Sequence, residues 1–283
     1  AIYGFSHGNY ETLIGLDANH EIGEGKRIAS EVQQQTDVAV FSSTEFRLKR
    51  WILRTGLRYA YNSAFSSPLI YSFQSRYDLD NSQVIKLAYG RGFRAPSLKE
   101  LYLDFNDSRH AVYGNDQLAA ESSHSFTSTY QKYLSKGDWT WFSGVDLFYN
   151  RINNKIELTI LGPLEATYNN ISRFETVGSS ISQRLSYKNL NLSVSFNYTG
   201  RYTGIEDAEA DFNYSAQWLI QPNVVFPEQQ LSLNLFINHF GALNNVFEDT
   251  ASGELSITEM AAYSMIDFSL NKKFLNKRLN LTA

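Results

Sequence analysis

Long stretches of strict period-two alternation constrain this chain more than any other feature. In LSVSFNYTGRY (192–202), apolar and aromatic residues alternate with small or polar ones, and WILRTGLRYAY (51–61) and WTWFSGVDLFYN (139–150) behave in a similar way. Successive side chains of a β-strand point to opposite faces, so each stretch is predicted to be a strand with one apolar and one polar face. Helical periodicity does not persist over any comparable length. The alternation therefore predicts an all-β fold.

The same alternation, followed along the chain, predicts twelve strands and the start of a thirteenth near Arg278. Several are more than about fourteen residues long, whereas strands of soluble proteins usually have about five or six. This length argues against a soluble β-sandwich or solenoid and favours an antiparallel transmembrane β-barrel. The predicted strands are 9–20, 36–49, 51–64, 69–79, 82–94, 121–135, 139–161, 167–188, 191–204, 212–226, 229–243 and 260–274.

The predicted connections fall into two alternating kinds, which is typical of an outer-membrane barrel with short periplasmic turns and longer extracellular loops. Tight turns are predicted near residues 49, 80, 137, 189, 227 and 275. The other connections are 21–35, 95–120, 205–211 and 244–259, with shorter members at 65–68 and 162–166. Loops as long as 95–120 are uncommon in compact domains and are often functional.

Aromatic residues support the membrane interpretation independently. Trp51 and Tyr61 are ten residues apart on one predicted strand, and Trp139 and Tyr149 repeat the interval on another. Ten residues of a tilted strand span roughly 25 Å of the membrane normal, which matches an apolar band between two aromatic girdles. The opposite face would then line the lumen. It carries Arg54, Arg58, Lys86, Asp146 and Arg201.

Composition excludes several classes of function. The chain has no Cys, which rules out disulfides and thiolate metal sites, and its net charge of -4 without a basic block makes nucleic acid a poor partner. No apolar run is long enough for a transmembrane helix, but a strand-spanning protein does not need one. We find no nucleophile elbow, phosphate loop, dinucleotide fingerprint or metalloprotease motif, so we predict no catalytic residues, no cofactor and no enzyme activity.

Two short boxes enclose the longest predicted loop. The first, GFRAPS, ends a strand, and the second, GNDQLAAES, leads into the next one. Together they resemble the paired boxes of the TonB-dependent outer-membrane receptors, although Asp116 and Ala120 stand where that family usually has Pro. The matching residues are Phe93, Arg94, Ala95, Pro96 and Ser97 in the first box and Gly114, Asn115, Leu118, Glu121 and Ser122 in the second.

The resemblance implies a function that the residues alone do not. Residues 1–283 would form a single domain, a fragment of about 12–13 strands of a 22-stranded barrel in the outer membrane of a Gram-negative bacterium. The plug, the energy-coupling box and the first strands would lie outside this chain. The expected activity is uptake of a scarce nutrient such as a ferric siderophore, haem or cobalamin. The expected partners are this extracellular ligand, outer-membrane lipid and, through the plug, the TonB energy-transducing complex. The alternative is a passive porin-like barrel without a plug.

Physical chemistry suggests a shaping role for the boxes. Pro96 cannot donate to a strand ladder and would end strand pairing at the rim. Arg94 could anchor the loop by pairing with a carboxylate, and Gly114 with Asn115 predicts a turn before the descending strand. The candidate carboxylates are Asp104, Asp107 and Glu121. We favour this loop-shaping interpretation over direct contact with a ligand.

His110 lies between the boxes, near Tyr102 and Tyr113. By position it resembles a histidine of haem receptors in the family that helps capture haem iron, and neutral imidazole is a suitable axial ligand. The simpler interpretation is a solvated loop histidine. A Ca²⁺ site made by Asp104, Asp107 and Asp116 is a weaker hypothesis, because their spacing matches no EF-hand. A barrel enzyme would need a Ser–His or Asp–His arrangement that the sequence does not indicate.

Overall fold

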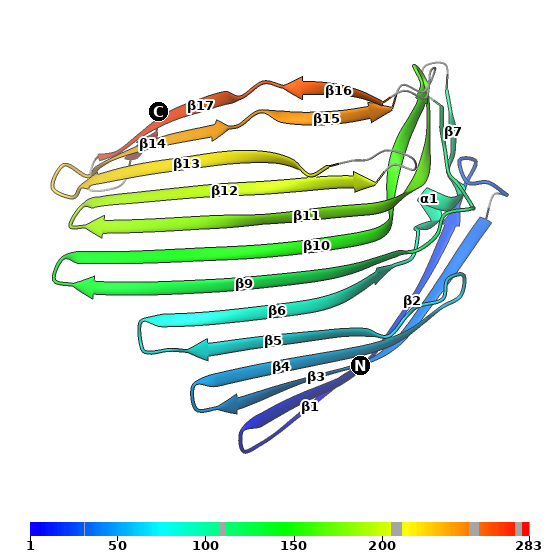
Figure 1. Ribbon diagram of the computed structural model, residues 1–283, viewed down its shortest axis with the longest axis horizontal. Coiled ribbons are helices and arrows are strands. Elements are labelled where there is room, and N and C mark those ends of the chain that lie inside the picture. The colour runs from blue at the N-terminus through cyan, green and yellow to red at the C-terminus, as the bar shows by residue number, and fades with distance from the viewer. Residues whose placement is uncertain (31, 108–110, 205–210, 249–254, 275–278, 283) are drawn as a thin grey trace.

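The computed structural model describes residues 1–283 except 31, 108–110, 205–210, 249–254, 275–278 and 283 (Figure 1). The described chain is almost entirely strand, with one short helix, α1 (Leu98–Tyr102). The strands are β1 (Ile2–His7), β2 (Tyr10–Glu24), β3 (Val32–Leu48), β4 (Trp51–Asn62), β5 (Ile70–Asp78), β6 (Gln83–Arg94), β7 (Asp104–Asn106), β8 (Ala111–Tyr113), β9 (Glu121–Lys136), β10 (Trp139–Gly162), β11 (Glu165–Tyr187), β12 (Leu190–Gly204), β13 (Asn213–Phe226), β14 (Leu231–Phe240), β15 (Leu243–Glu248), β16 (Leu255–Met260), β17 (Tyr263–Phe274) and β18 (Leu279–Thr282).

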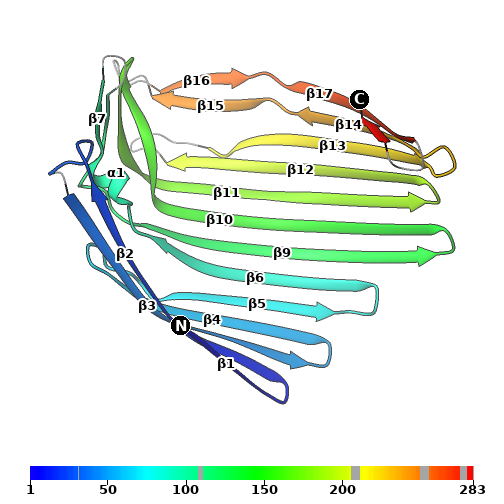
Figure 2. The ribbon, with the colours of Figure 1, turned by 180° about the vertical axis from the view of Figure 1, so that it is seen from behind.

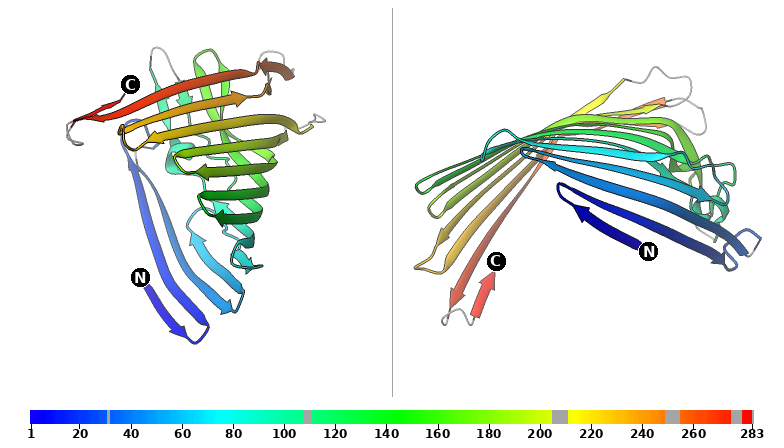
Figure 3. Two further views of the ribbon diagram at one scale, coloured as in Figure 1. Left: turned by 90° about the vertical axis from the view of Figure 1, so that its left-hand side faces the viewer. Right: turned by 90° about the horizontal axis from the view of Figure 1, so that it is seen from below.

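Fourteen of these strands form one continuous wall in the order β1 to β6, β9 to β14, β17 and β18, and every neighbouring pair is antiparallel. The wall is curved, like part of a barrel (Figure 3). β7 and β8 lie off this path: β7 pairs with β8, and β8 pairs in parallel with β11. β15 and β16 form a separate two-stranded ribbon. The predicted all-β fold of antiparallel strands is confirmed.

The two rims of the wall differ, as the alternation of connections predicted. One rim carries tight turns, and the other carries α1 and the long hairpin of β10 and β11 (Figures 1 and 2). At the turn between β9 and β10, Lys136 pairs with Trp139, and Gly137 adopts a φ of 60°. Glycine reaches this left-handed conformation without steric cost, which explains why it stands in a two-residue hairpin turn. We call the two ends the short-turn rim and the long-loop rim.

Strand register confirms which residues share a face. Trp51 and Trp139 lie at the short-turn rim, and their rings lie 4.5 Å from Tyr77 and 4.1 Å from Tyr187, respectively. The large apolar side chains of this face are widely exposed; Leu147, for example, is 51% exposed. On the opposite face, Arg58 pairs with Asp17 at 2.9 Å. Register also places on this polar face the predicted lumen residues Arg54, Arg58, Lys86, Asp146 and Arg201.

Several predicted boundaries were wrong. β1 was not among the predicted strands; a two-residue turn that begins at Gly8 joins it to β2. β2 and β3 remain paired as far as Glu24, which lies opposite Val32, so the connection is much shorter than the predicted loop 21–35. The strand predicted at 229–243 ends at Phe240, and β15 begins just after it. The connection 162–166 is likewise only a tight turn, since β10 and β11 run well beyond the other strands.

Apart from Ala39 in β3, the buried apolar side chains of the described chain lie at the long-loop rim. Leu101, Leu118 and Ile156 form one buried cluster, with Phe65 and Tyr168 packed against it. A curved sheet with two exposed faces has no interior of its own, so the core forms where a loop folds back over the strand ends. Within the described residues, no helix has the length and apolarity needed to cross a membrane.

Candidate functional site

The segment 95–120, which we call the rim loop, begins with a proline and a short capped helix. Pro96 is less than 2% exposed and ends β6, as its missing N–H predicts. Ser97 caps α1: its Oγ accepts a hydrogen bond from the Glu100 N–H at 3.3 Å, and the Glu100 carboxylate accepts one from the Ser97 N–H at 2.8 Å. This reciprocal capping box fixes the direction in which the chain leaves the strand.

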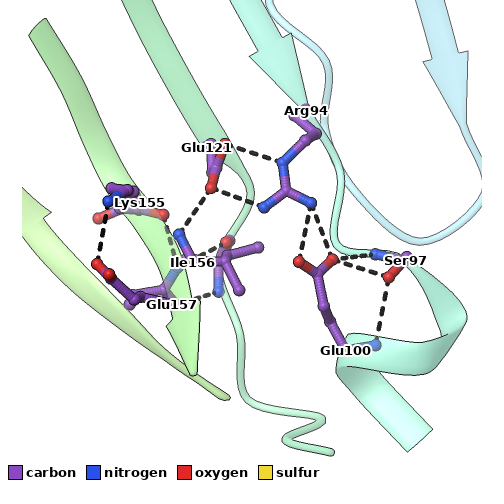
Figure 4. A network of polar contacts seen from close by, with 10 residues as sticks. Arg94, Ser97, Glu100, Glu121, Lys155, Ile156 and Glu157 are labelled. Carbon is purple, nitrogen blue, oxygen red and sulfur yellow. Dashed lines mark hydrogen bonds and ion pairs between the residues drawn. The ribbon is translucent and has the colours of Figure 1, made fainter. Parts of the chain in front are cut away.

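Arg94 joins the two boxes through two carboxylates (Figure 4). Its Nε and Nη2 donate to the two oxygens of Glu121 at 2.9 and 2.7 Å, and its Nη1 donates to Glu100 at 2.8 and 3.0 Å. Glu121 also accepts a hydrogen bond from the Ile156 N–H of β10 at 2.7 Å. One guanidinium thereby connects the end of β6, the start of β9, α1 and, through Glu121, the side of β10.

The carboxylates of this network are held in their charged form. Burial alone would raise the pKa of Glu100, but hydrogen bonds from Arg94 and Ser97 outweigh it and hold the pKa below its usual value. The side chains of Glu100 and Glu121 are only 16% and 15% exposed, whereas Arg94 is 44% exposed. Planar guanidinium matches carboxylate geometry in a bidentate way, so the pairing fixes orientation as well as distance.

Gly114 and Asn115 lock the returning arm of the rim loop onto α1. The Gly114 N–H donates to the Leu103 carbonyl at 2.7 Å, and the Asn115 N–H donates to the Glu100 carbonyl at 2.9 Å. A Cβ at Gly114 would lie 2.6 Å from backbone atoms of Leu101 and Leu103, so a side chain does not fit there. The glycine of the second box is therefore required by close backbone approach.

Asn115 and Asn170 tie the same arm to the long hairpin. The Asn115 Nδ2 donates to the Tyr168 carbonyl at 2.9 Å, while its Oδ1 accepts from the Gln117 N–H. The Asn170 Oδ1 accepts from the Ala119 N–H at 2.8 Å, and its Nδ2 donates to the Ala119 carbonyl at 3.0 Å. These side-chain amides hold the returning arm against β11.

The segment predicted as the long loop 95–120 also carries strand and bridge contacts of its own. β8 pairs with 165–167 of β11. On the other side, the Ala29 N–H donates to the Tyr102 carbonyl at 2.8 Å, and the Asp104 N–H donates to the Arg27 carbonyl at 2.9 Å. The rim loop is thus braced between the β2–β3 connection and the β10–β11 hairpin.

The remaining predicted residues are placed as follows. Phe93 and Ala95 flank Arg94 at the end of β6, and Leu118 is 3% exposed in the rim cluster. Tyr102 packs against that cluster from α1. The Tyr113 hydroxyl accepts a hydrogen bond from Asn106 at 3.2 Å. His110 lies outside the described residues.

Of the three carboxylates considered as partners of Arg94, the structure shows pairing with Glu121. Glu100 was not considered, although the spacing S-x-x-E from Ser97 is a sequence signal for a capping box and identifies it. Asn170 carried no such signal, because its role depends on the tertiary position of β11. Among the described residues, no three His, Asp or Glu side chains gather in a way that could hold a metal ion, so the suggested Ca²⁺ site is not found there.

The arrangement is structural in its chemistry: it fixes one conformation of the loop at a barrel rim. A curved antiparallel wall with one apolar and one polar face, tight turns at one end and a braced loop at the other defines a transmembrane β-barrel protein. The chain matches the family model "TonB dependent receptor-like, beta-barrel" over residues 3–283 and belongs to that family.

Similar proteins agree with this assignment. A hemoglobin and hemoglobin-haptoglobin-binding protein of Haemophilus influenzae is 26% identical over 200 residues, which are 64% of this chain and 18% of that protein. A mutant ferric enterobactin receptor of Pseudomonas aeruginosa, solved with enterobactin, has a TM-score of 0.76 at 16% identity and covers all of this chain. The FrpB iron transporter of Neisseria meningitidis has a TM-score of 0.75 at 13% identity and covers 99%. The chain spans 47% and 48% of those two structures.

Proposed function

We propose that this chain is the wall and part of the ligand-binding mouth of an outer-membrane receptor for energy-coupled uptake of an iron-containing nutrient. The observation that carries the proposal is the family match over nearly the whole chain. The cargo class is supported by three similar proteins, which are a ferric enterobactin receptor, an iron transporter and a haemoglobin-binding protein. Cobalamin, which the family resemblance alone would allow, receives no support from them.

In this proposal the wall performs no chemistry. Cargo binds at the mouth, the polar face lines the passage, and the inner-membrane energy-transducing complex acts through a plug encoded outside these 283 residues. The braced rim loop contributes a fixed platform at the mouth. Rigid elements hold binding groups more precisely than mobile ones and lower the entropy lost on binding.

The test is uptake of radiolabelled iron by cells that express the full-length protein as their only such receptor. Ferric siderophore and haemoglobin are supplied separately. We expect saturable uptake of one cargo that disappears when the proton gradient is collapsed or the TonB complex is deleted. Uptake that persists without energy and rises linearly with concentration would contradict the proposal and favour the passive porin-like alternative.

A haem-binding role of His110 stays a prediction, which the similarity to a haemoglobin-binding protein supports. Titration of the full-length protein with haem is expected to shift the Soret band, and His110→Ala is expected to remove the shift. His124→Ala is the matched control, because His124 lies in β9 and is hydrogen-bonded to Tyr89. No shift in the wild-type protein at micromolar haem would contradict this role.

A further inference from the structure

The apolar face of the wall changes character abruptly near the long-loop rim. In one register row across β6, β9 and β10, Tyr89 is opposite Phe126, and Phe126 is opposite Tyr149. The next row toward the rim holds Arg91, His124 and Arg151 in the same three strands. A row of aromatic rings is therefore followed directly by a row of basic side chains on the same face.

The adjacent strand, β11, adds one more basic residue and one acid. Glu175 is opposite Arg151, and Arg173 stands one row higher. The Glu175 side chain is only 3% exposed, whereas Arg151 and Arg173 are 43% and 44% exposed. Arg173 donates to Glu175, and the Arg151 Nε lies 3.7 Å from the same carboxylate oxygen. Two half-exposed guanidinium groups thus share one buried carboxylate and retain a net positive charge.

The other members of the row are not neutralised within the described residues. The Arg91 Nε is buried and has no hydrogen-bond partner among the atoms that the structure describes. His124 contacts the phenol of Tyr89 through Nδ1 at 2.8 Å, and that contact supplies no negative charge. We call Arg91, His124, Arg151 and Arg173 the basic belt.

The depth of the basic belt matches the membrane interface. Arg151 lies twelve residues beyond Trp139, whose ring stacks on Tyr187 at the short-turn rim. Twelve residues of a tilted strand span roughly 30 Å along the membrane normal, slightly more than an apolar band of about 25 Å. Charged groups are tolerated on the lipid-facing side of a barrel at the interface and not at the midplane. The belt therefore lies at headgroup level.

We propose that the basic belt binds the phosphate groups of lipid headgroups in the membrane leaflet at the long-loop rim. Guanidinium forks match phosphate geometry, and long basic side chains beside an apolar surface extend toward the interface. Glu175 orients Arg151 beside it and Arg173 one row higher, and the aromatic row beneath contacts the upper acyl chains. The inference rests on the proposed position of the wall in a membrane, but it does not depend on which cargo is carried.

The test uses the full-length protein in detergent, with lipid A, its dephosphorylated form and inorganic phosphate as three separate probes. Thermal unfolding and native mass spectrometry report binding. We expect lipid A to raise the unfolding temperature and remain bound, the dephosphorylated form to bind about tenfold or more weakly, and inorganic phosphate to have no effect. Equal binding of both lipids, or an equal shift with phosphate alone, would overturn the proposal.

The decisive variant combines Arg91→Gln, Arg151→Gln and Arg173→Gln with Glu175→Gln, so that no buried carboxylate is left unpaired. It loses two net positive charges, and the matched control, Lys136→Gln with Lys188→Gln at the short-turn rim, loses the same number. We expect the preference for lipid A to disappear in the first protein and persist in the second. Heat-dependent migration on gels shows that each variant still forms a barrel. A folded belt variant that keeps the preference would contradict the proposal, whatever the uptake assay shows.

Discussion

The wall and the rim loop reach a fixed structure by different means. In the wall, each residue needs only its two neighbouring strands, and the outward side chains remain exposed; Ile181, for example, is 40% exposed. In the rim loop, Pro96, Leu101 and Leu118 are buried, and a single guanidinium organises both boxes. The structure of the wall is determined by a repeating sequence pattern that matches the different surroundings of its two faces. The structure of the rim loop is determined by a few particular contacts.

This difference predicts different sensitivities. The wall should be sensitive to polarity and depth, and tolerant of changes in side-chain shape. The stability of the rim loop should fall when a single atom is added at a close backbone approach or when one partner of an ion pair is removed. Four substitutions or conditions separate these cases, and each leaves one region as an internal reference for the other.

The largest effect is expected for Val145→Arg, which places a charge on the apolar face near the middle of the span from Trp139 to Tyr149. Charge at the midplane of a barrel costs about 2–4 kcal/mol, and charge near an interface costs about 0–1 kcal/mol. Leu190→Arg, on the same face beside a short turn, is the matched control. Unfolding by denaturant in lipid vesicles measures both. Equal losses of stability would contradict the assigned depth.

Gly114→Ala tests close approach in the rim loop. The new Cβ would lie 2.6 Å from backbone atoms of Leu101 and Leu103, so the two arms of the loop must separate, at a cost of about 1–3 kcal/mol. Gly162→Ala, where no atom lies within 4 Å of the added carbon, is the control. Limited proteolysis should cut within 95–120 only in the Gly114 variant. An uncut loop would show that the approach is not required.

Arg94→Gln is expected to reduce the free energy of unfolding by somewhat less, about 1–2 kcal/mol. The substitution leaves Glu100 and Glu121 without their shared partner, but Arg94 is partly exposed, which limits the loss. Arg76→Gln removes an exposed pair with Asp78 and should cost less than about 1 kcal/mol. Denaturant unfolding with a probe attached to the rim loop measures the difference. Identical values for the two variants would mean that the network does not stabilise the loop.

The smallest effect is a pH dependence confined to the rim loop. Because the pKa of Glu100 is lowered in the folded protein, its contribution is fully present above the usual glutamate pKa of about 4.3 and is lost as pH falls through the lowered value. Proteolysis of the rim loop with an acid-active protease should therefore accelerate below about pH 4. The change should be weaker in Glu100→Gln. Acceleration that begins near neutral pH would contradict this assignment.

The same contrast explains what the sequence could predict. Period-two alternation predicted the faces of β4, β10 and β12, because alternate residues of each strand are apolar or polar according to the side that they face. The ends of strands were less certain: β1 was missed beside a two-residue turn, and β10 and β11 extend further than expected. Turn residues and strand ends depend on pairing that alternation does not report.

The rim loop was predictable only in part. Pro96 as a strand terminator and the pairing of Arg94 with a carboxylate followed from residue chemistry, but the choice of Glu121 among three candidates did not. Burial of Leu118 beside Ile156, and the contacts of Asn170, depend on where the β10–β11 hairpin stands in space. The basic belt depended in the same way on register, since its members are far apart in sequence and meet only when the strands pair.

Hydrogen exchange of the full-length protein in lipid vesicles tests most directly whether the rim loop is a folded brace. The amides of Leu101, Leu103, Gly114 and Asn115 each donate a hydrogen bond within the rim loop, so we expect protection close to that of the β9 and β10 amides in the wild-type protein. In Arg94→Gln, we expect this protection to fall while the strand amides stay protected. Rapid exchange of the four amides in the wild-type protein would contradict the account.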